Sequence, residues 1–131
     1  HPPVLCHADI HVGNVLITPD DRLYVIDWDT VILAPKERDL MFPGAGIDGS
    51  LAPQAAAQVD WFFAGYGPCA LDRDLLAYYR CERVIQDIAA YCDQILPSTE
   101  GGADRVVGLG QLQSQFAPGS VVAIALASIP G

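Results

Sequence analysis

The residues of this chain whose types and spacing could do chemistry stand near its beginning. His7 and Asp9 are followed by Asn14 in the pattern H-x-D-x-x-x-x-N, and Asp27 comes after the two apolar stretches that follow. A carboxylate such as that of Asp9 can accept the proton of a hydroxyl group. A side-chain amide and a further carboxylate supply the oxygen atoms that a hard divalent cation prefers. The set therefore indicates a site that combines proton acceptance with metal binding, provided that the fold brings these residues together.

A β-hairpin is the element that could bring them together. The β-branched and apolar residues 14–18 and 23–26 predict two strands joined by a turn rich in Pro and Asp. Because the second strand runs back along the first, we expect Asp27 to return to the polar loop that carries Asp9 and Asn14.

The rest of the chain is expected to be mainly helical. The longest helix, 72–96, has Asp72 as its N-cap and ends before Pro97, with a core-facing stripe that includes Leu75, Tyr78 and Ile85. Hairpin first and helices afterwards define an α+β protein that is mainly helical. The other elements expected are a strand at 3–6, an irregular extended link at 28–35, a helix opening at 36–42, helices at 54–67 and 105–116, and loops at 44–53 and 98–104.

Composition narrows the classes of function. The 131 residues include 7 basic and 16 acidic side chains, and this net charge of −9 argues against nucleic-acid binding. An acidic surface suits a cationic substrate or metal ions, although it also simply favours solubility. The longest apolar run, 121–127, is far shorter than the roughly 20 residues of a membrane span, so no membrane partner is expected. Four widely spaced cysteines indicate free thiols and a cytoplasmic location.

Other interpretations of the opening stretch stay open at this point. Individually, Asp9, Asn14 and Asp27 could be a turn residue, a strand-edge residue and the end of a hairpin. His7, Asp9 and His11 also alternate, and could ligate zinc or iron in a hydrolase. Such sites usually need further histidines downstream, whereas the third histidine of this chain is His1.

Several motifs occur together in this chain, and in this combination the chain resembles the aminoglycoside phosphotransferase family, which has a kinase-like fold. The shared features are the loop CHADIHVGN, the hairpin, the segment VIDWD and the run PKERDL. The sequences of these segments resemble most the spectinomycin phosphotransferase branch of the family. The resemblance is looser over 60–96. It implies the C-terminal lobe of such a fold, with a catalytic loop and metal-binding hairpin at 1–35, a helical substrate subdomain at 36–117 and a tail at 118–131.

The resemblance also implies roles for individual residues. Asp9 would be the catalytic base, or the carboxylate that orients the acceptor hydroxyl. Asn14 and Asp27 would hold Mg²⁺ on the phosphates of ATP. His7 would be structural and hold the loop through hydrogen bonds. Asp39 would cap its helix and brace the catalytic loop.

Acidic side chains are candidates for contact with a cationic substrate. Asp29 would face either the substrate or the backbone. Glu82 would be either a partly buried ion-pair partner of Arg80 or Arg83, or a residue that meets a substrate amine. Charge alone adds Asp48, Asp60 and Asp87.

The function implied by the resemblance is ATP-dependent O-phosphorylation of a small hydroxylated, cationic molecule. An aminoglycoside or aminocyclitol antibiotic such as spectinomycin is the expected acceptor, which would make the enzyme one of antibiotic resistance. Kinases of the choline, homoserine and fructosamine type share the motif and stay open as alternatives. A non-catalytic, kinase-like binding domain is a further alternative.

The parts that clamp the nucleotide in this family are not found among these residues. A lysine paired with a helix glutamate, and a loop over the phosphates, come before the H-x-D loop. Here six residues precede His7, and the single lysine, Lys36, follows it. We therefore expect an N-terminal lobe outside these 131 residues and little ATP-dependent activity without it. The face on which that lobe docks should be apolar and could mediate self-association.

Overall fold

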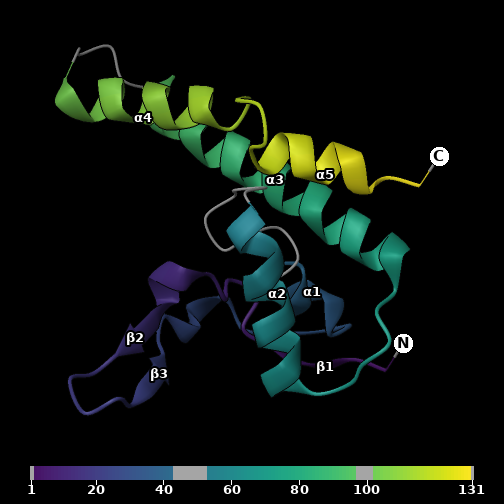
Figure 1. Cartoon of the computed structure of the whole chain (residues 1–131). Helices are drawn as coiled ribbons and strands as arrows, with labels where there is room; N and C mark the ends of the chain where they lie inside the picture. The colour runs from purple at the N-terminus through teal and green to yellow at the C-terminus, as the bar shows by residue number, and fades with distance from the viewer. Residues whose placement is uncertain (1, 43–52, 97–101, 131) are drawn as a thin grey trace.

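The computed structural model describes residues 2–42, 53–96 and 102–130 (Figure 1). The strands are β1 (Val4–Cys6), β2 (Val15–Ile17), β3 (Leu23–Val25) and β4 (Ile32–Ala34), with single 3-10 turns η1 (Val12–Asn14) and η2 (Trp28–Thr30). The helices are α1 (Glu37–Leu40), α2 (Pro53–Tyr66), α3 (Arg73–Ile95), α4 (Ala103–Ser114) and α5 (Val121–Ser128). The expected α+β, mainly helical fold class is confirmed.

The four strands form two separate antiparallel pairs. Strands β2 and β3 pair from Val15↔Val25 to Ile17↔Leu23, which confirms the predicted hairpin. Strand β1 pairs with β4, with Cys6 opposite Ile32. The expectation of an irregular extended link over 28–35 was therefore only partly right: residues 32–34 are extended, but they form the regular strand β4, whose partner is far away in the sequence and is not indicated by any local turn.

Helix α3 is the central element on the helical side. Its N-cap is Asp72, as predicted, whose Oδ1 accepts hydrogen bonds from the amides of Asp74 at 2.9 Å and Leu75 at 3.1 Å. Helices α4 and α5 both pack along it, and α1 packs near its beginning (Figure 1). Met41 forms a small core with two residues of α3, Leu76 and Tyr79.

The predicted core-facing stripe of α3 was partly wrong. Tyr78 and Ile85 are 57% and 67% exposed, whereas Leu76 and Tyr79 are buried. The neighbouring helices decide which face is covered, and apolar residues occur on more than one face of this helix. Spacing alone therefore could not choose between the faces.

The tail at 118–131, for which the sequence predicts no element, contains α5. Ser120 is its N-cap residue, and Ile124 and Ala125 are buried. The segment is apolar on all sides, so it has no helical period for a sequence pattern to detect. No helix in the described ranges is both long and apolar enough to cross a membrane. Of the loops expected at 44–53 and 98–104, residues 44–52 and 98–101 lie outside the described residues, whereas Pro53 begins α2 and Ala103 begins α4.

Candidate active site

The loop after β1 is held by a carboxylate of α1. The backbone amides of His7 and Ala8 donate to Asp39 Oδ2 at 2.8 Å and Oδ1 at 2.7 Å. Ala8 has a positive φ of 67°, which a residue other than Gly rarely adopts. The two charge-assisted hydrogen bonds offset the strain of this turn. Asp39 does not cap α1, contrary to expectation, because it lies inside that helix, whose N-cap residue is Lys36.

The ring of His7 links the same loop to the end of the hairpin. It is 2% exposed, and its Nε2 lies 2.8 Å from the carbonyl oxygen of Ile26. Its Nδ1 accepts a 3.3 Å hydrogen bond from the amide of Asp9. This pair of contacts assigns the proton to Nε2, which donates to Ile26. The neutral ring therefore has both nitrogens engaged by the backbone.

Asn14 makes the second link between loop and hairpin. Its side chain is buried and its Nδ2 donates to the carbonyl oxygen of Asp9 at 2.9 Å. The backbone carbonyl oxygen of Asn14 accepts a 3.0 Å hydrogen bond from the backbone amide of Ile26. Because the side-chain nitrogen Nδ2 is hydrogen-bonded to Asp9, the side-chain oxygen Oδ1 is the atom through which Asn14 can ligate a cation.

Asp27 comes directly after Ile26, so the hairpin returns it to this place. Its backbone is left-handed, with φ at 67°. The hydrogen bond with the Asp29 carboxyl raises the pKa of Asp27, and the negative charges of Asp29 and Asp9 and partial desolvation add to the effect. The two neighbouring carboxyl groups repel each other when both are charged, and a divalent cation would relieve that repulsion. Asn14, Asp27 and Asp29 thus offer oxygen donors that fit Mg²⁺.

Asp9 meets Arg83, which the sequence suggested only as a partner of Glu82. Nη1 of Arg83, in α3, pairs with Asp9 Oδ1, and Nε of the same guanidinium binds Asp87 Oδ1 at 2.9 Å. On the other side, His11 Nε2 lies 3.7 Å from Asp9 Oδ2. The only available sequence signal was the Arg83–Asp87 spacing of four on a helix, which says nothing about a loop 74 residues away.

Glu82 has a different partner from the one expected. Its Oε2 lies 3.8 Å from Nε of Arg38, and its Oε1 accepts the hydroxyl of Tyr78 at 3.1 Å. The expected pairing with Arg80 or Arg83 was wrong, because residues one or two positions apart on a helix do not face each other. Of the other acidic candidates, Asp87 binds Arg83, Asp60 is exposed on α2, and Asp48 lies outside the described residues.

The alternative metal site of a hydrolase gains no support. Within the described ranges, no cluster of three or more His, Cys, Asp or Glu side chains could hold a metal ion. The ring nitrogens of His7, which that site would use, bind the backbone instead. A site built on Asn14 and two carboxylates is of a different kind, because an amide is among its donors.

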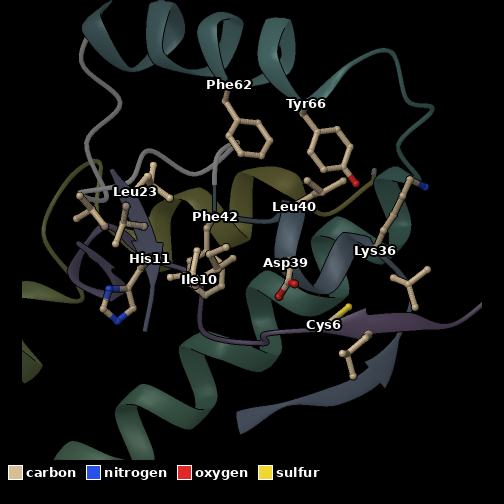
Figure 2. A pocket seen from close by; sticks show the side chains of 15 residues that line it. Cys6, Ile10, His11, Leu23, Lys36, Asp39, Leu40, Phe42, Phe62 and Tyr66 are labelled. Atoms are coloured by element: carbon tan, nitrogen blue, oxygen red, sulfur yellow. The ribbon is translucent and has the colours of Figure 1, made fainter. Parts of the chain in front are cut away.

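An apolar pocket of about 580 Å³ lies beside this cluster, between the strands and helices α1 and α2. Figure 2 shows Phe62 and Tyr66 directed from α2 toward it, with Leu40 and Asp39 of α1 on the opposite side. Asp9, Asn14 and Asp27 are not among its lining residues. The pocket is thus separate from the polar cluster that could do chemistry.

Comparison with known proteins agrees with this geometry. The model of the phosphotransferase enzyme family (APH) matches residues 1–71, more than half of the chain, and the chain belongs to that family. A crystal structure of spectinomycin phosphotransferase APH(9)-Ia with ADP and spectinomycin is 41% identical and covers 97% of this chain, with a TM-score of 0.82. The AMP-bound complex of APH(9)-Ia is 39% identical and covers 98%, with a TM-score of 0.78. The chain spans 38% of the length of each.

Proposed function

We propose that the protein containing this chain transfers the γ-phosphoryl group of ATP to a hydroxyl group of a small cationic aminocyclitol such as spectinomycin. The observation that carries the proposal is the linkage of three residues: Asn14 Nδ2 donates to the carbonyl of Asp9, and the backbone carbonyl of Asn14 accepts from Ile26, which directly precedes Asp27. Family membership supports the reaction class. The 41% identity to a protein that binds ADP and spectinomycin supports the acceptor.

In this reaction Asp9 would accept the proton of the acceptor hydroxyl or orient that hydroxyl. Phosphoryl transfer depends mostly on positioning and on stabilising charge, so a rigid carboxylate matters more than a strong base. The loop is suited to that task, since Asp39 binds its two amides and His7 binds Ile26. The backbone that carries Asp9 is therefore fixed from both sides.

Asn14 and Asp27 would hold the Mg²⁺ of the nucleotide, with Asp29 as a further donor. Bound Mg²⁺ neutralises charge on the phosphate oxygens during transfer. The amide of Asn14 adds an oxygen donor without adding a negative charge, and a divalent cation would relieve the repulsion between the carboxyl groups of Asp27 and Asp29.

We further propose that this chain is part of a C-terminal, substrate-binding lobe of a cytoplasmic enzyme, where ATP is available. The 38% coverage of APH(9)-Ia supports a nucleotide-clamping lobe in the remainder of the protein. Lys36 is no substitute for a lysine on the phosphates, because its Nζ binds Glu37 Oε1 at 2.7 Å. The net charge of −9 favours a cationic acceptor.

The test is a chimera in which this chain replaces the matching 38% of APH(9)-Ia, below called the chimera. Phosphate transfer from ATP is measured with spectinomycin, choline, homoserine and a fructosamine as acceptors. We expect turnover with spectinomycin. The control variant Asp9→Asn should reduce kcat by about 10²–10⁴-fold. Turnover with choline or homoserine alone would assign a different substrate, and no transfer to any acceptor would overturn the proposal.

A further inference from the structure

We propose that Arg83 is a positioning residue for Asp9, and that Asp87 in turn holds Arg83. The inference rests on the proposed function, because it takes Asp9 as the group that meets the acceptor hydroxyl. None of the sequence motifs points to Arg83, which comes from α3 on the helical side of the molecule.

The contacts of Arg83 form a chain of three charged side chains. One nitrogen, Nη1, pairs with Asp9 Oδ1, and another, Nε, binds Asp87 Oδ1 at 2.9 Å. The side chains of Arg83, Asp9 and Asp87 are 28%, 20% and 26% exposed, so solvent and salt screen them less than a surface pair. The guanidinium also lies 5.8 Å from the ring centre of Phe42.

These contacts restrict the one freedom that the loop leaves to Asp9. Asp39 and His7 fix the backbone, but the carboxyl group can still rotate about its side-chain bonds. Arg83 binds Oδ1 through a planar, preorganised donor group and thereby fixes that rotation. Oδ2, which lies 3.7 Å from His11, is then the oxygen that can meet the acceptor.

Asp87 completes the arrangement by holding the other side of the guanidinium. With Nε bound to Asp87, the guanidinium is itself held in place, so Asp9 Oδ1 is bound to a fixed partner. The positive charge of the Arg83 guanidinium also offsets the negative charge near Asp9 and Asp27, where anionic phosphates must approach. Both effects favour a correctly oriented carboxylate during transfer rather than tighter binding of the acceptor.

The test compares variants of the chimera with spectinomycin as acceptor. Arg83→Met should lower kcat about 10–100-fold, with KM for the acceptor changed by less than about threefold, since the lost contact orients the reacting group. Arg83→Lys should recover part of the loss, and Asp87→Asn should lower kcat by about three- to tenfold. Arg73→Met removes the same charge from an exposed position at the start of α3, and should leave kcat within about twofold.

A second readout separates positioning from folding. Tm is measured for Asp9→Asn, Arg83→Met and the double variant, and we expect non-additive shifts because the two side chains touch. Additive shifts, or an unchanged kcat for Arg83→Met, would overturn the inference. So would a loss of kcat that matches the loss of folded protein and is not recovered by Arg83→Lys. An unaltered chimera that phosphorylates no acceptor would instead overturn the proposed function, and this inference with it.

Discussion

Single polar residues tie the loop after β1 to the end of the hairpin, and most of their hydrogen bonds go to the backbone. His7 and Asn14 contact the two backbone groups of Ile26, one at its carbonyl and the other through its amide. Asp39 accepts two amides of the loop. Backbone contacts of this kind fix the path of the chain, which places Asp9 and Asp27 without using their own carboxyl groups.

Asp39→Asn is expected to destabilise the chain by about 1–3 kcal/mol. Both backbone amides lose their charged partner, and because an Asn side chain has one acceptor oxygen, the amide of either His7 or Ala8 is left without an acceptor. The measurement is the free energy of unfolding from urea titration followed by circular dichroism. Asp60→Asn, on the exposed face of α2, is the matched control and should stay within about 0.5 kcal/mol. Equal effects of the two substitutions would show that Asp39 does not hold the loop.

Glu37 should make the stability of the chain depend on pH in the acid range. Burial by itself raises the pKa of Glu37, but hydrogen bonds from Lys36 and the amide of Asp72, together with the Lys36 charge, bring its net pKa below the ordinary 4.5. A depressed pKa stabilises the fold fully above the unfolded value, and this contribution is lost as pH falls through the folded pKa.

As the pH falls, the free energy of unfolding is expected to decrease less in Glu37→Gln than in the unaltered chain. Free energies of unfolding are compared at pH 7 and at several values below 4.5. The two proteins should differ most at pH 7 and converge as the pH falls. A constant difference across the whole range would contradict the assignment.

The residues of the candidate site could be predicted from the sequence, but their partners could not. The H-x-D-x-x-x-x-N spacing indicates Asp9 and Asn14 because the loop and hairpin are local structures. Arg83 and the Arg38 partner of Glu82 come from segments that meet only in the fold. No local pattern records which face of α3 turns toward the loop.

Among the secondary-structure elements, those with a local signal were predicted and those without one were missed. The hairpin has a turn, and α3 has the N-cap Asp72 and a following Pro97. Strand β4 pairs with a distant partner, and α5 is apolar on every side, so neither gives a readable period. The packing of α5 on α3 is seen in the structure and could not be predicted from the sequence. Stability measurements can test it.

Two residues of α5 offer a matched pair for that check. Ile124 is 5% exposed, whereas Leu126, two positions on, is 63% exposed. Ile124→Ala should destabilise the chain by about 2–4 kcal/mol, because it removes buried methyl groups. Leu126→Ala should cost less than about 1 kcal/mol, as judged by urea unfolding. Similar costs for both would mean that α5 does not pack on α3 as described.

For the whole molecule, the main feature is how much apolar surface this chain exposes. Leu5 in β1 is 66% exposed, its partner Leu33 in β4 is 74% exposed, and Trp61 in α2 is 72% exposed. Apolar side chains this exposed favour association. Together with the 38% coverage of APH(9)-Ia, they support the proposal that further protein covers part of this surface.

The isolated 131 residues are expected to self-associate, whereas the chimera should be monomeric. Sedimentation velocity at concentrations up to about 100 µM would measure the difference. Leu5→Ser combined with Leu33→Ser should weaken the association, since both side chains stand opposite each other on the exposed β1–β4 pair. A monomer at all concentrations would contradict this expectation.

The central claim is that Asn14 and Asp27, next to Asp9, hold Mg²⁺ on a nucleotide. The most direct measurement is calorimetric titration of ADP into the chimera with and without Mg²⁺, with Asp27→Ala as the variant. The account predicts that Mg²⁺ tightens ADP binding by about tenfold or more, and that Asp27→Ala abolishes this gain while Mg²⁺-free binding persists. Equal Mg²⁺ dependence in the two proteins would contradict the claim.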